Sequence, residues 1–120
     1  MKYLCLIYSD ETAWRTLPKS DELAMMSEYR NFGESIKSSG HWLAGFRLQD
    51  TDTATTVRIR NGKVSTTDGP FAETKEQLGG FYLIEARDLN DAIQVAGRIP
   101  GARMGSIEVR PIWEPVPQPA

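Results

Sequence analysis

Residues 68–76 gather most of the side chains in this chain that could do chemistry. They read Asp-Gly-Pro-Phe-Ala-Glu-Thr-Lys-Glu, so a turn signal is followed by an aromatic residue and three further charges. Asp68 and Glu73 could transfer protons or anchor a ligand, and Lys75 could keep one of them ionised or bind an acidic ligand. Phe71 would add an apolar contact. Connections between strands are usually short, so a long, charged, proline-stiffened loop is typical of a segment that presents side chains.

The same segment also has a purely structural interpretation. Asp68 would cap its own turn, Phe71 would plug the edge of the core, and Glu73 and Lys75 would form a solvated pair. The residues alone leave both interpretations open. Asp68 and Glu73 are therefore candidate catalytic residues, and Lys75 and Phe71 are candidate ligand-binding residues.

Three further side chains are candidates for ligand binding. Arg110, on the last predicted strand, could clamp a carboxylate or phosphate, or it could pair with Glu108 or Glu85 across a sheet. Tyr8 and Tyr82 would place hydroxyls at strand ends near a pocket, although core tyrosines with one solvated tip are commoner.

The chain has one histidine, His41, and one cysteine, Cys5. We expect His41 to be a partly exposed residue at a strand edge and Cys5 to be inert within a buried strand. A transition-metal site would need more such ligands. We therefore expect no metal and no cofactor.

Length and charge narrow the class of protein. A chain of 120 residues predicts one domain. A net charge of -2 gives no electrostatic case for binding nucleic acid or an anionic membrane. The longest apolar run, residues 3–8, is too short to span a bilayer or to act as a signal peptide. We expect a cytoplasmic protein whose partners are neither nucleic acids nor membranes.

The first predicted strand, residues 2–9, is apolar on both faces. Tyr3, Cys5 and Ile7 alternate with Leu4, Leu6 and Tyr8. Such a strand must be covered on both sides. Helices can cover one side, and in so small a protein we expect a second copy to cover the other, which predicts a homodimer.

Periodicity and capping signals predict the remaining elements. A first helix should run from an N-cap at Ser20 to about Ser39, and a second should begin at Asp88 or Asn90 and end at Pro100. Strands are expected at 41–49, 55–60, 63–67, 79–86 and 106–112, with Asn61-Gly62 as a hairpin turn. The first helix should bury a stripe of Leu23, Met26, Tyr29, Phe32 (or Gly33) and Ile36. In strand 55–60, Val57 and Ile59 should face inward, and Arg58 and Arg60 outward.

The order strand, helix, strand, hairpin, strand, helix, strand predicts an α+β fold. It is a split βαβ arrangement with an inserted hairpin and two helices on one face of an antiparallel sheet. We expect this domain to occupy residues 1–112 and to be followed by a proline-rich tail, residues 113–120.

The nonapeptide at 68–76, together with Met1-Lys2-Tyr3 at the start and Val109-Arg110-Pro111 near the end, resembles the DGPF-type proteins, a branch of the YCII-related family. The resemblance implies a ferredoxin-like fold whose sheets pair as a dimeric α/β barrel. The wider family resembles enzymes that carry a histidine early in the first helix and an acidic residue before the proline after the second. Here the first predicted helix has no histidine and Ile99 precedes Pro100, so that pair cannot be carried over.

Two classes of function follow. One is a small dimeric domain that binds a small polar or acidic molecule, with a cofactor-independent reaction left open, because fold relatives run isomerase, monooxygenase and dismutase chemistry. The alternative is a regulatory or interaction protein, because DGPF-type proteins resemble companions of extracytoplasmic-function sigma factors.

Overall fold

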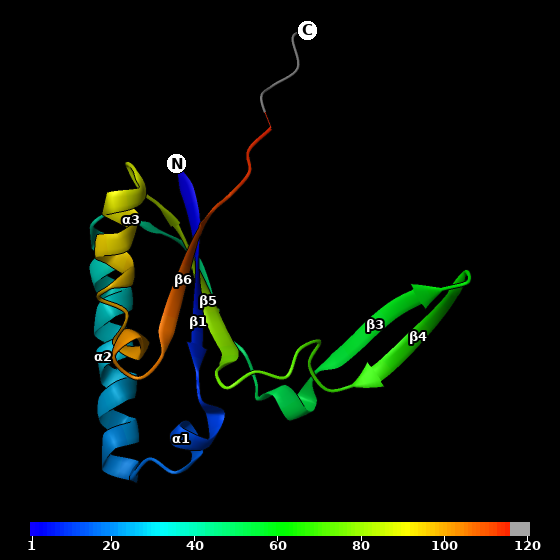
Figure 1. Cartoon of the computed structure of the whole chain (residues 1–120). Coiled ribbons are helices and arrows are strands. Elements are labelled where there is room, and N and C mark those ends of the chain that lie inside the picture. The colour runs from blue at the N-terminus through cyan, green and yellow to red at the C-terminus, as the bar shows by residue number, and fades with distance from the viewer. Residues whose placement is uncertain (116–120) are drawn as a thin grey trace, which may run out of the picture.

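The computed structural model describes residues 1–115 of the chain (Figure 1). Its elements, in chain order, are β1 (Lys2–Ser9), α1 (Glu11–Arg15), α2 (Lys19–Ser38), β2 (Trp42–Arg47), the 3₁₀ turn η1 (Thr51–Thr53), β3 (Thr55–Arg60), β4 (Lys63–Asp68), β5 (Gln77–Glu85), α3 (Leu89–Ala96), the 3₁₀ turn η2 (Pro100–Arg103) and β6 (Ser106–Pro111).

Four of the strands form one antiparallel sheet in the order β2-β5-β1-β6. In its register, Tyr3 lies between Ile84 of β5 and Pro111 of β6. Helices α2 and α3 lie on one face of this sheet (Figure 1). The predicted split βαβ arrangement is confirmed, and it is that of a ferredoxin-like α+β domain.

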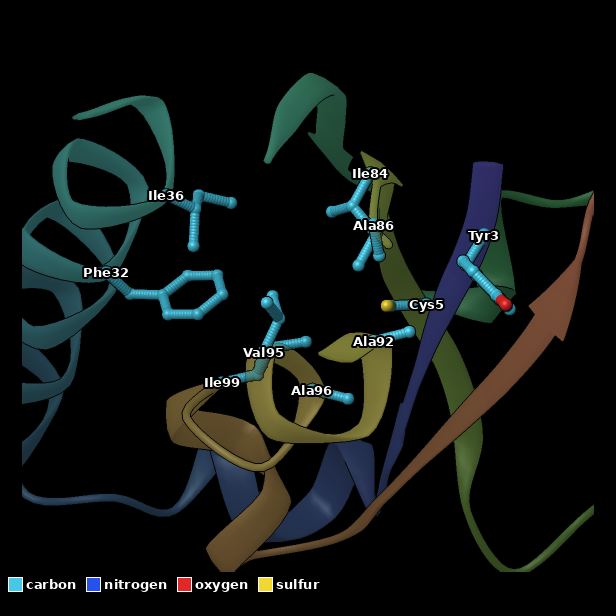
Figure 2. Close-up of a cluster of buried hydrophobic side chains, with 10 residues drawn as sticks. All are labelled: Tyr3, Cys5, Phe32, Ile36, Ile84, Ala86, Ala92, Val95, Ala96 and Ile99. Atoms are coloured by element: carbon cyan, nitrogen blue, oxygen red, sulfur yellow. The ribbon is translucent and has the colours of Figure 1, made fainter. Parts of the chain in front are cut away.

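The core lies between the sheet and the two helices (Figure 2). From the sheet, Tyr3, Cys5 and Ile84 are each 1% exposed or less, and they meet Ile36 of α2 and Val95 of α3. Leu4, Leu6 and Tyr8 point to the opposite face because side chains alternate along a strand. The prediction for strand β1 is thus correct in its pattern, and the face without helices is half-buried and apolar.

The N-terminus of α2 differs from its prediction. The helix begins at Lys19, and its N-cap is Pro18, whose carbonyl accepts from the amides of Asp21 and Glu22 at 3.0 Å each. Proline fits this position because its ring holds φ at −56° and it has no amide of its own. The N-cap of α3 is Asp88, one of the two predicted caps, and its carboxylate accepts from the Asp91 amide at 2.8 Å. The helix ends at Ala96, short of the predicted end at Pro100, which begins η2 instead.

The buried stripe of α2 is also displaced from the predicted one. Phe32 and Ile36 are buried as expected, and Tyr29 packs against the core. Leu23 and Met26, however, are 57% and 45% exposed, while Met25 is buried. The N-terminal half of the helix extends past the ends of the strands (Figure 1), and there Met25 and Met26 border a cavity instead of the core.

Strands β3 and β4 form a separate two-stranded sheet that projects away from the domain (Figure 1). Val57 and Ile59 were predicted to face inward, yet they are 60% and 65% exposed, because the hairpin extends past the core. The radius of gyration is 17.0 Å, against about 14 Å for a compact chain of this length.

The predicted tail begins at Trp113, which is 84% exposed. Glu114 pairs with Lys2 at 3.4 Å. The rest of the predicted tail, residues 116–120, lies outside the described residues.

Candidate functional site

A cavity of about 450 Å³ lies between α2 and the helix-facing side of β2 and β5. Helix α1 and the segment from β2 to η1 close one end of it. This volume suits a small molecule. Aromatic side chains form much of its wall: Trp14, Tyr29, Trp42 and Tyr82.

Two glycines make room for the cavity. A side chain at Gly33, inside α2, would meet nothing within 4 Å, although a glycine inside a helix costs roughly 0.5–1 kcal/mol relative to alanine. A Cβ at Gly45 of β2 would lie 2.6 Å from the Tyr82 ring. Only glycine at position 45 therefore lets that ring lie across strand β2 as the cavity wall.

Tyr82 is held by two aromatic neighbours. Its ring meets Phe32 and Trp42 edge-on, with centroid distances of 5.1 and 5.8 Å. Its hydroxyl has no hydrogen-bond partner within residues 1–115, and burial raises the pKa of Tyr82 to about 12. At neutral pH this hydroxyl is therefore a neutral donor that a ligand in the cavity could use.

Tyr29, on α2, has its hydroxyl already engaged. The hydroxyl oxygen accepts from the Gly101 amide at 3.0 Å. This bond connects α2 to η2, and Gly101 is buried, so the amide has no access to water. Burial raises the pKa of Tyr29 as well. Tyr29 therefore contributes its ring to the cavity and its hydroxyl to the fold.

Three cations, Arg30, Lys37 and Arg47, also line the cavity. Lys37 Nζ lies 4.8 Å from the centre of the Trp42 ring, and the Arg47 guanidinium lies 5.9 Å from the Trp14 ring. None of the three forms an ion pair with any residue that the structure describes. Their N–H donors are therefore available to a ligand.

The acidic residues in the wall are mostly engaged. Glu11 accepts from the amide and the hydroxyl of Thr51 at 2.7 and 2.8 Å. Asp50 accepts from Arg15 Nε at 2.9 Å. Together these contacts attach α1 to η1. Glu34 is the remaining carboxylate in the wall, so the cations outnumber the unengaged acids and the site favours an anion.

The structure distributes the predicted site residues over three places. Tyr82 lines the cavity. Tyr8 and Arg110 lie on the sheet face without helices, where Arg110 pairs with Glu108. The remaining predicted residues, which are Asp68, Phe71, Glu73 and Lys75, lie at the end of β4 and in the exposed connection to β5.

The side chains of that connection meet neither the cavity nor the core. Phe71 is 81% exposed, and Arg58 lies 5.8 Å from its ring. Asp68 makes no cap bond; the turn is held by the Gly69 amide, which donates to the Ala54 carbonyl at 2.8 Å. Within the described residues Glu73 and Lys75 do not pair. The contacts of the predicted structural interpretation are therefore not formed in the single chain.

His41 forms a polar cluster away from the cavity. Its Nε2 lies 3.1 Å from Asp91 Oδ2, and its Nδ1 lies 2.6 Å from Ser39 Oγ. Asp91 also accepts from the Arg87 amide at 3.0 Å, and this bond, with the His41 contact, lowers the pKa of Asp91. The cluster joins the start of β2 to the first turn of α3, which is a structural role, and its residues do not line the cavity described above.

Two kinds of site are absent from the described part of the chain. No three histidine, cysteine, aspartate or glutamate side chains there are grouped to hold a metal ion. None of its helices is long and apolar enough to cross a membrane.

Residues 1–115 match the YCII-related domain family. The chain belongs to this family. An uncharacterised protein of Rhizobium meliloti (strain 1021) is 37% identical to it over 114 residues, which cover 93% of this chain and 92% of that relative. The YCII-related membership implied by the sequence is confirmed, and the DGPF-type branch stays a prediction.

Sequence reasoning missed the cations of this YCII-related cavity, although a signal was present. Arg30, Gly33 and Lys37 follow one another at spacings of three and four, so they share one face of α2 beside its buried stripe. A helix-interior glycine between two cations on that face indicates open space next to positive charge. This pattern is weaker than that of the nonapeptide, which concentrates more charge in fewer residues.

Proposed function

We propose that this YCII-related chain binds a small acidic molecule with an aromatic or apolar body in the cavity between α2 and the sheet. The observation that carries the proposal is the group of Arg30, Lys37 and Arg47, which line the cavity and form no ion pairs within residues 1–115; Lys37 and Arg47 lie beside aromatic rings of its wall. A ligand carboxylate would receive charge-assisted hydrogen bonds from the arginines. The aromatic side chains would cover the rest of the ligand.

Tyr82 would act as a donor in this site. Because burial raises its pKa to about 12, its hydroxyl is poorly suited to act as a base at neutral pH and well suited to donate to a ligand oxygen. The site therefore supports binding more directly than turnover. A cofactor-independent reaction stays a prediction.

A panel of aromatic carboxylates tests the proposal. Benzoate, phenylacetate and indole-3-acetate, each compared with its neutral amide, would be screened by thermal shift and then by calorimetry. We expect at least one carboxylate to bind and its amide to bind much more weakly. If no member binds, or if an amide binds as well as its acid, the anionic specificity is refuted.

Two arginine variants assign that binding to the cavity. Arg47→Gln should weaken it about tenfold or more, because a hydrogen bond to a charged group is worth roughly 1.5–3 kcal/mol. Arg98→Gln is the matched control, since Arg98 donates to Ser35 outside the cavity, and it should change affinity little. Equal losses in the two variants would show that only net charge matters.

We further propose a homodimer formed through the open sheet face, which is the face without helices. This face carries Leu4 and Leu6 of β1, Phe81 and Leu83 of β5, and Phe46, which is 67% exposed. The smallest dimension of the chain is 18 Å, which accommodates the sheet and one layer of helices only. Sedimentation at micromolar concentration should give a dimer, and a stable monomer would contradict the proposal.

The nonapeptide at 68–76 supports placing the chain in the DGPF-type branch. We propose that it acts in the cytoplasm, because its one cysteine is a free, buried thiol. The alternative function, contact with an extracytoplasmic-function sigma factor, stays a prediction.

A further inference from the structure

The hairpin of β3 and β4, residues 55–68, is amphipathic; we call it the arm. Cross-strand pairs place Val57 opposite Thr66 and Ile59 opposite Val64 on one face. The opposite face carries Arg58 opposite Ser65 and Arg60 opposite Lys63. One face of the arm is therefore apolar, and the other is cationic.

The apolar face of the arm is uncovered in the single chain. Val57, Ile59 and Val64 are 60%, 65% and 69% exposed. The arm also projects away from the domain, so the core of the same chain cannot cover these side chains (Figure 1). A two-stranded hairpin is marginally stable in water unless a hydrophobic face packs against something else. The arm thus exposes an apolar face that needs a second surface to cover it.

The same chain carries a surface of matching character. The open sheet face is also apolar and has no helix over it, and it lies on the main body while the arm extends beyond it. In a two-fold dimer, a contact between the arm of one chain and the body of the other is made twice, because both surfaces occur on both copies. Its cationic face would then remain in solvent, where Arg60 and Lys63 already are.

The exposed area fits a second copy as the occupant. The chain exposes 8644 Å² of accessible surface, whereas a compact monomer of this mass exposes about 6,500 Å². The excess is more than the roughly 800 Å² that each partner contributes to a standard interface. Nucleic acid fits poorly, because the cationic face is small and the net charge of the chain is -2.

We infer that the arm of each chain packs its apolar face, Val57, Ile59 and Val64, against the body of a second copy of this chain. The inference rests on the proposed homodimer and adds to it a defined pair of contacting surfaces. It makes the arm the feature that selects the partner. A chain with a disrupted arm should then fold as a monomer or as a weak dimer.

Two lysine substitutions on opposite faces of the arm test the inference. Ile59 and Ser65 are both exposed in the single chain, so neither change disturbs the core. Ile59→Lys should raise the dimer dissociation constant about 100-fold or more, since each dimer would lose two buried isoleucines. Ser65→Lys, on the cationic face, should change it less than about threefold.

Hydrogen exchange on the unmodified chain supplies a second readout that needs no variant. Amides in residues 55–68 should be protected at high protein concentration and lose protection on dilution below the dissociation constant. If the arm were held by its own body, this protection would not depend on concentration, and the inference would be overturned.

The outcomes separate the two proposals. A dimer that is unaffected by Ile59→Lys, with arm amides insensitive to dilution, would overturn the role of the arm and leave the dimer through the open sheet face in place. A wild-type chain that is monomeric at micromolar concentration would refute both. Loss of dimer in Ile59→Lys but not in Ser65→Lys supports the inference.

Discussion

Removing the hydroxyl of Tyr29 or of Tyr82 should have opposite consequences, although both residues line the same cavity. In Tyr29→Phe, the buried Gly101 amide loses the acceptor that it contacts at 3.0 Å. A buried donor left without a partner costs about 1–3 kcal/mol. In Tyr82→Phe no described hydrogen bond is lost, so the free energy of unfolding should change by less than about 0.5 kcal/mol.

These values convert to measurable shifts in melting temperature. The entropy of unfolding is roughly 0.25 kcal/mol/K for a chain of this length, so a loss of about 1–3 kcal/mol lowers the melting temperature by about 4–12 °C. Protein concentration must be held constant, because a dimer has a concentration-dependent melting temperature. Tyr82→Phe should melt within about 2 °C of wild type.

Ligand affinity should respond in the reverse way. Tyr82→Phe removes a donor worth about 0.5–1.5 kcal/mol, so it should weaken an acidic ligand about two- to tenfold. Tyr29→Phe should change affinity little at temperatures well below its melting transition. If Tyr82→Phe destabilises as much as Tyr29→Phe, its hydroxyl has a structural partner. If Tyr29→Phe loses the ligand without losing stability, the assigned roles are reversed.

The remaining predictions concern Asp91, Cys5, Gly69 and Glu73. The pKa of Asp91 is lowered by the Arg87 amide and by His41, so its stabilising effect is present above the usual carboxyl pKa and is lost as pH falls through the folded-state pKa. Chemical unfolding should be measured at pH 7 and at pH 3, which is about one unit below the usual carboxyl pKa. The difference in free energy of unfolding between wild type and Asp91→Asn should be smaller at pH 3. Burial raises the pKa of the Cys5 thiol to about 11, so a thiol reagent at neutral pH should label it only on unfolding, and fast labelling of native protein would contradict its burial. Gly69 has φ +105°, so Gly69→Ala should lower the free energy of unfolding, measured by thermal melting, by more than about 1 kcal/mol. Glu73→Gln should change the free energy of unfolding by less than about 0.5 kcal/mol and should keep ligand affinity. A loss of affinity in Glu73→Gln would place Glu73 in the site.

The fold could be predicted because each strong local signal agreed with the packing. Alternation in β1 fixed which side chains enter the core, and Asn61-Gly62 fixed the tip of the arm, where both residues have positive φ. Local signals failed where the chain leaves the core. Val57 and Ile59 alternate as a half-buried strand would, but periodicity cannot tell whether the layer that buries them belongs to the same chain.

The cavity was harder to predict because it is defined by empty space. Gly45 opens the wall for Tyr82 across a strand pair, and that contact depends on register, which a single sequence fixes weakly. Arg47 and Lys37 come from different elements, and their proximity is a property of the tertiary fold. A motif search favours residues that are close in sequence, and so it selected residues 68–76.

The position of the nonapeptide suggests why a charged, proline-containing segment stands there. Gly69 turns the chain where β4 ends, its amide donates to the Ala54 carbonyl, and its carbonyl accepts from Thr56 at 2.9 Å. These contacts close the base of the arm. Because Pro70 then limits the backbone, the segment sets the direction in which the arm leaves the domain. If the arm packs on a second copy, this direction determines the dimer, and the motif can be explained by assembly without any chemical role for Glu73.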